Sequence, residues 1–114
     1  MDTKIVKEKI SLDALKEIAK EQYGDMVKAA VDVARETVAL GGELHSDANE
    51  KLLEAGSEQK NIWGINIYPD RPKSDWIEFT SLINIRPSAS NRSMIIQDKA
   101  LQQRITDIIN ALIV

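Results

Sequence analysis

Hydrophobic residues recur at helical spacing in two parts of the chain. The first stripe predicts a helix over 12–22, with Ser11 as its N-cap and Gly24 as the residue that ends it. The second stripe follows Asp98, which we expect to cap the last helix. The apolar positions are 12, 15, 18 and 19 in the first stripe, and 101, 105, 108, 109 and 112 in the second. Both patterns are typical of amphipathic helices that bury one face.

Apolar and polar residues alternate in other parts of the chain, and this alternation predicts strands. We expect strands over 3–9, 62–68 and 76–86. In the last of these, one predicted face is apolar and the other is polar. The polar face would carry Glu78, Thr80, Asn84 and Arg86.

The segment 26–40 fits both periods, because its valines are spaced for a helix and also alternate as in a strand. β-Branched residues lose side-chain freedom in helices and favour strands. We therefore predict a hairpin, with strands near 26–33 and 37–45 and a turn at 34–36.

Asp47 and Glu50 have the spacing of a capping box, which predicts a short helix over 48–55. The elements then run strand, helix, strand, strand, helix, strand, strand, helix within a single domain, 1–114. Such an order predicts an α+β two-layer sandwich, with a mostly antiparallel sheet and the helices on one face. The other sheet face would carry polar side chains, among them Asn66, Asn84 and Arg86.

Composition narrows the classes of function. A net charge of −3 disfavours DNA and RNA as partners, since an acidic surface repels their phosphates. The chain has no cysteine, which excludes thiolate catalysis and iron–sulfur clusters, and a single histidine disfavours zinc. Segment 1–9 lacks the apolar core of a secretory signal, and no run approaches the roughly 18 apolar residues of a membrane-spanning helix. We therefore expect a cytoplasmic protein without a membrane segment.

Three short blocks contain most of the unusual polar residues. They are Gly-Gly-Glu-Leu-His-Ser-Asp at 41–47, Trp-Gly-Ile-Asn-Ile-Tyr-Pro at 63–69, and 81–93, which contains Ser-Leu-Ile-Asn-Ile-Arg-Pro and Asn-Arg-Ser. In these blocks the chain resembles a family of small prokaryotic proteins known only as a domain of unknown function. The resemblance spans nearly the whole chain. It implies no activity, cofactor or catalytic residue, so a function must be inferred from the residues.

The first block offers a candidate for acid–base chemistry. On a strand, Glu43, His45 and Asp47 would share one face. Glu43 could then orient His45 as a general base, or the three side chains could hold a divalent cation. The alternative is structural, with Asp47 occupied as a helix cap and His45 hydrogen-bonded to a neighbour. The sequence specifies no metal and no cofactor.

The other two blocks offer a candidate for anion binding. The guanidinium groups of Arg86 and Arg92 suit a phosphate or a carboxylate, and nearby amides would orient it. The alternative is that these side chains pair with acids and with loop backbone. The candidate residues are Asn66, Asn84, Arg86, Asn91, Arg92 and, for stacking on a ring, Trp63.

These patterns support three functions. The first is the binding of a small anionic ligand on the polar sheet face. The second is a small hydrolase or lyase in which His45 is the general base. The third is a structural or regulatory domain in which that sheet face pairs with an identical subunit to form a homodimer.

Overall fold

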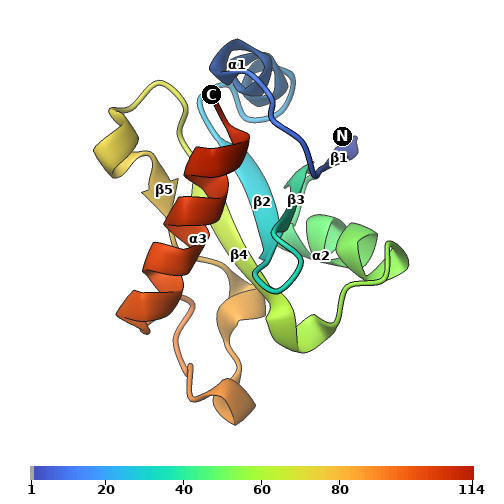
Figure 1. Ribbon diagram of the computed structural model, residues 1–114, viewed down its shortest axis with the longest axis vertical. Helices are drawn as coiled ribbons and strands as arrows, with labels where there is room; N and C mark the ends of the chain where they lie inside the picture. The colour runs from blue at the N-terminus through green and yellow to red at the C-terminus, as the bar shows by residue number, and fades with distance from the viewer. Residues whose placement is uncertain (1) are drawn as a thin grey trace.

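The computed structural model describes residues 2–114, which form three α-helices and a five-stranded sheet (Figure 1). The helices are α1 (Leu12–Glu21), α2 (His45–Glu54) and α3 (Lys99–Leu112). The strands are β1 (Thr3–Val6), β2 (Val27–Asp32), β3 (Thr37–Gly41), β4 (Ile62–Ile67) and β5 (Ile77–Glu78). The predicted α+β class is confirmed. Among the described residues, no helix is both long and apolar enough to cross a bilayer.

The predicted caps of the first and last helices are confirmed. The Ser11 hydroxyl accepts a hydrogen bond from the Ala14 amide, and Asp98 accepts from the amides of Ala100 and Leu101. Each bond satisfies an N–H group that has no partner within its helix. Gly24 has a φ of +88° and ends the turn after α1, as predicted.

The sheet is antiparallel throughout, in the order β1-β3-β2-β4-β5. The predicted hairpin is confirmed, since β2 pairs with β3 and Val31 lies opposite Val38. Asp32 accepts hydrogen bonds from the amides of Ala34 and Arg35, which fixes the turn between the two strands.

One face of the sheet is covered by α1 and α3, and Figure 1 shows α3 in front of the sheet. Alternate residues of β2, β3 and β4 point toward these helices and form the main core. The fully buried aliphatic residues of this core include Leu15, Val31, Leu40, Ile65, Ile67, Ile105 and Ile109.

The opposite face is covered by α2, so the prediction that all helices lie on one face was wrong. Ala30, Ala39 and Gly64 present small or absent side chains on this face, where Ala48 and Leu52 of α2 pack. Sequence alternation is weak here, because the alanines are apolar residues on the side that we expected to be polar. The polar part of this face lies beyond α2, at Lys28 and Asn66.

The predicted strand 76–86 was wrong beyond its first residues. β5 pairs with β4 only at Asn66 and Ile67, and a 3-10 turn follows at Leu82–Asn84. The Ser81 hydroxyl accepts a hydrogen bond from the Ile83 amide and starts this turn.

Side chains replace the missing strand along the edge of β4. The Asn84 amide accepts a hydrogen bond from the Gly64 N–H at 2.8 Å and donates to the Gly64 carbonyl at 2.9 Å. Two residues earlier on β4, the Ile62 carbonyl accepts a hydrogen bond from the Arg86 guanidinium at 2.6 Å. Asn84 and Arg86 thus make the hydrogen bonds that a neighbouring strand would make.

The start of α2 also differs from the prediction. The helix begins at His45 rather than at 48, and Asp47 is its third residue rather than its N-cap. The Asp47 carboxylate accepts from the Leu44 N–H, which is half of a capping box. Gly41 and Gly42 have φ values of +101° and +96°, and these left-handed conformations end β3 and turn the chain into the helix.

Candidate functional site

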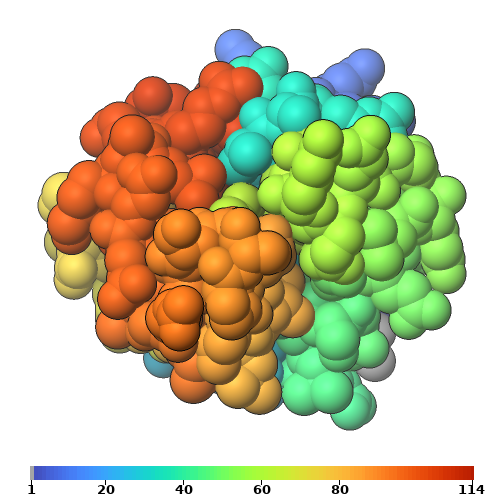
Figure 2. Space-filling model, turned by 90° about the horizontal axis from the view of Figure 1, so that it is seen from below, coloured from blue at the N-terminus to red at the C-terminus, as the bar shows by residue number. Residues whose placement is uncertain are grey.

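A cavity of about 500 Å³ opens where the first turn of α2 meets the polar end of the second sheet face. The segment 80–83 forms its third side. On the face seen in Figure 2, the 81–95 region (orange) and α2 (green) lie next to each other. The polar residues of the wall include Lys28, His45, Asn66 and Glu78, and the apolar ones include Met26, Leu44, Leu82, Ile83 and Met94.

Three of the polar residues form a row across the sheet. Lys28 on β2 is the register partner of Asn66 on β4, and Asn66 is the partner of Glu78 on β5. Cross-strand partners point to the same face, with their Cβ atoms about 5 Å apart. A cation, an amide and a carboxylate therefore follow one another along the cavity.

Asn66 is 7% exposed, and the orientation of its side chain follows from its hydrogen bonds. Its Nδ2 donates to Glu78 Oε1 at 2.7 Å and to the Thr80 carbonyl at 3.4 Å. Both partners are acceptors, so the amide nitrogen must face them. The Oδ1 atom is left buried without a partner. A buried acceptor without a donor is costly, and Asn66 is one of the residues that line the cavity.

His45 lies at the first position of α2, and its tautomer is set by the sheet. Its Nε2 is 2.9 Å from the Ile65 carbonyl oxygen, which can only accept, so Nε2 carries the proton. Burial lowers the pKa of His45 below its ordinary value, and the positive charge of Lys28 lowers this pKa further. The hydrogen bond to Ile65 and the nearby Asn66 and Glu78 raise the pKa, but the net shift is downward. The neutral ring has Nδ1 as a proton acceptor, which is the form that a general base requires.

We expect this histidine to make the protein less stable as the pH falls below about 6.5. The folded pKa lies below the unfolded value, so the unfolded chain binds more protons in the window between them. Stability therefore rises with pH across that window. Urea unfolding of the wild type and of His45→Gln, at about pH 7.5 and about pH 5.5, measures this dependence.

Glutamine in that variant keeps an N–H donor for Ile65 and cannot titrate. The acid-induced loss of stability should therefore be smaller in His45→Gln than in the wild type. Equal losses in the two proteins would show that His45 is not responsible.

The other members of the predicted trio do not accompany His45. Glu43 is exposed and lines a separate acidic groove with Asp47, beside α2. The expectation that the three share one strand face was wrong, because position 45 lies in a helix. The Ile65 carbonyl, rather than Glu43, orients the imidazole. In the part of the chain that the structure describes, no group of three acidic or histidine side chains is arranged to hold a metal ion.

Most of the predicted anion-binding residues lie together, but their side chains are bonded to backbone groups. Asn84 and Asn91 are buried and bonded to backbone groups, and Asn91 Nδ2 donates to the Asn84 carbonyl at 2.8 Å. Arg86 is bonded to carbonyl oxygens, and its guanidinium lies 4.3 Å from the centre of the Trp63 ring. Arg92 is exposed and does not line the cavity.

Trp63 and Asn66 were expected to complete one pocket, which was wrong. They are three residues apart on β4, so they point to opposite faces of the sheet. Trp63 belongs to the core beneath α3, whereas Asn66 faces the cavity beside α2. Of the residues singled out from the sequence, His45 and Asn66 are brought together at this cavity. Trp63, Asn84, Arg86 and Asn91 are brought together elsewhere, beside the edge of β4.

Lys28 and Glu78 were missed as site residues. A signal for Lys28 was present, since it is the one charged position within the apolar run Val27–Val31. Glu78 had no comparable signal, because its role depends on the register between β4 and β5.

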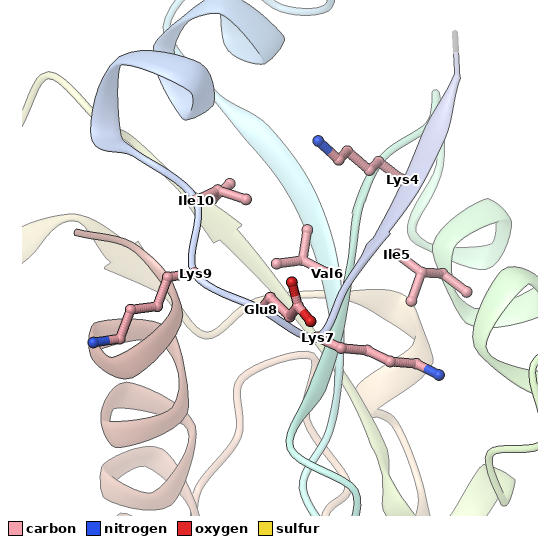
Figure 3. Close-up of a pocket in the computed structure, with 7 residues that line it drawn as sticks. All are labelled: Lys4, Ile5, Val6, Lys7, Glu8, Lys9 and Ile10. Atoms are coloured by element: carbon pink, nitrogen blue, oxygen red, sulfur yellow. The ribbon is translucent and has the colours of Figure 1, made fainter.

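A second cavity, of about 450 Å³, follows β1 and the turn after it, over residues 4–10. Its three lysines are Lys4, Lys7 and Lys9. Figure 3 shows that Lys7 and Lys9 point away from each other, so these cations do not converge on one ligand. This cavity lacks a buried polar group of the kind that Asn66 provides.

A known protein family matches nearly the whole chain. One family model matches residues 4–112, and its description is a protein of unknown function (DUF5674). No curated protein and no solved structure matches the chain.

Proposed function

The chain belongs to this family of proteins of unknown function, and from that premise we propose that it binds a small molecule with an anionic group in the cavity beside His45. The volume of about 500 Å³ is in the range of small-molecule sites, and the walls combine apolar side chains with a few convergent polar groups. The ligand is a carboxylate or a phosphate, as the sequence suggested, but its cation is Lys28 rather than Arg86 or Arg92.

The observation that carries this proposal is the position of Lys28. Its side chain is half-buried at the cavity wall, and it forms no ion pair with any acid among residues 2–114. Its ammonium lies 5.2 Å from the centre of the Tyr23 ring. A partly buried cation without a carboxylate partner favours an anion from outside the chain.

The first turn of α2 supports the same proposal. His45 and Ser46 both line the cavity, so the N-terminal end of this helix faces it. The first N–H groups of a helix have no partner within it, and the helix dipole favours negative charge there.

We expect carboxylates or phosphates that fit the cavity to raise the thermal unfolding midpoint, and Lys28→Met to abolish the effect. A ligand at one hundred times its dissociation constant stabilises the native state by about 2.7 kcal/mol. The screen covers nucleotides, sugar phosphates, dicarboxylates and amino acids. Lys4→Met is the matched control, because it removes the same charge from an exposed position on β1. Equal shifts in the wild type and Lys28→Met would contradict the proposed site.

Acid–base catalysis by His45 is a second candidate function for the same cavity. The fixed tautomer favours it, because the Ile65 carbonyl holds the proton on Nε2 and leaves Nδ1 as a base. Any compound that binds is therefore also analysed for conversion to product. Conversion that is lost in His45→Gln, with binding retained, would identify His45 as the base.

A further inference from the structure

We infer that the ligand is a zwitterion, namely an amino carboxylate with an apolar side chain. This inference rests on the proposed binding of an anion at Lys28. The cavity offers a cation at one end of the polar row and hydrogen-bond acceptors at the other. An anion alone would satisfy Lys28 and leave the Glu78 carboxylate without a cationic partner.

The acceptor end consists of Asn66 and Glu78. Asn66 Oδ1 is buried, has no partner, and belongs to a side chain that lines the cavity. The Glu78 carboxylate accepts one hydrogen bond from Asn66 and retains further acceptor sites. Glu78 forms no ion pair with a described lysine or arginine. An ammonium group fits this end, because it donates three hydrogen bonds and neutralises the carboxylate.

The length of the row suits a small molecule. Lys28 and Glu78 lie on strands separated by β4, so their backbones are about 10 Å apart at the usual strand spacing of about 4.8 Å. The lysine side chain can shorten this gap, since its stem is flexible. An amino group and a carboxylate on the same or on neighbouring carbons can then reach both ends. Lys28 and Glu78 form no ion pair with each other, so both charges are left for a ligand that carries the two opposite charges.

The remaining wall selects for an apolar side chain on the ligand. Leu44 and Leu82 are 59% and 71% exposed, and Met94 is 40% exposed, yet all three line the cavity. Large apolar side chains that gather at the mouth of a cavity are typical of a binding surface. Methionine side chains adapt to ligands of different shape.

Calorimetric titration with four matched compounds tests this inference. L-Leucine carries both charges, 4-methylpentanoate lacks the amine, and 3-methylbutylamine lacks the carboxylate. The fourth compound, 2-hydroxy-4-methylpentanoate, retains a neutral donor in place of the ammonium. We expect leucine to bind at least about tenfold more tightly than the compounds that lack either charged group, since a charge-assisted hydrogen bond contributes about that factor.

Two variants assign each end of the ligand to its residue. In Glu78→Gln, which keeps an oxygen for Asn66, we expect leucine to lose its advantage over 4-methylpentanoate. In Lys28→Met, we expect it to lose its advantage over 3-methylbutylamine. The unfolding midpoint of each variant without ligand shows whether it is folded.

The outcomes separate this inference from the function on which it rests. If 4-methylpentanoate binds as tightly as leucine, the ligand needs no amine and the inference is overturned, while anion binding at Lys28 stands. If leucine does not bind but a phosphate or dicarboxylate does, the inference is likewise overturned while anion binding at Lys28 stands. If none of the anions binds, both the inference and the proposed function are overturned.

Discussion

Replacement of Asn84 by alanine is expected to lower the free energy of unfolding by about 3 kcal/mol or more. The side chain is fully buried, and it bonds the amide and carbonyl of Gly64 and the carbonyl of Met94. Alanine removes all three hydrogen bonds and leaves the Gly64 groups buried without partners. An unsatisfied buried backbone group costs about 1–3 kcal/mol, so the loss of several should be large. Urea unfolding followed by circular dichroism measures the change.

Asn49→Ala is the matched control for this variant. Asn49 makes two hydrogen bonds with the side chain of Gln59 at the surface, where water can replace them. The expected change is within about 0.5 kcal/mol. Similar small losses in both variants would show that another group pairs with Gly64 once Asn84 is removed.

Gly64→Ala is expected to destabilise the protein by about 2–3 kcal/mol through steric overlap. A Cβ atom at this position would lie 2.6 Å from Ser81 Cβ and 2.9 Å from Ile83 Cγ1. Gly64 lies within β4, where alanine adopts the backbone conformation without strain. The cost therefore comes from displacement of the 81–83 segment, and the thermal unfolding midpoint reports it.

A second substitution distinguishes steric overlap from other causes. Ser81→Gly removes the nearest atom and should restore part of the stability when it is combined with Gly64→Ala. The two changes should then be less destabilising together than the sum of the single variants. An additive double variant would mean that the 81–83 segment does not press on Gly64.

Elements that depend on local chemistry could be predicted from the sequence. Ser11 and Asp98 act as caps through residues three or fewer positions away, and such short-range bonds leave a visible pattern. The hairpin was predicted for a similar reason, because β-branched residues recur in both of its strands. The helix start at His45 was missed because two adjacent glycines with positive φ end the preceding strand early.

The candidate site depends on register and long-range packing, which the sequence does not display. Asn84 alternates with apolar residues as a strand residue would, yet its amide bonds to β4 from a turn. His45 was identified for its chemistry, but Lys28 and Glu78, which line the same cavity, come from two strands that are distant in the sequence. An alternation pattern reports which residues face the same way, and it does not report which strands become neighbours.

The closure of the β4 edge by side chains also bears on how the molecule opens. Where two strands are joined by backbone alone, hydrogen exchange of their amides follows the opening of the sheet. The Gly64 amide is bonded to the side chain of Asn84, in a turn, so it is freed when that turn detaches while β2, β3 and β4 remain paired. We therefore expect the 80–83 wall of the cavity to open at a lower free energy than the paired strands of the core, and the Gly64 amide to exchange earlier than theirs.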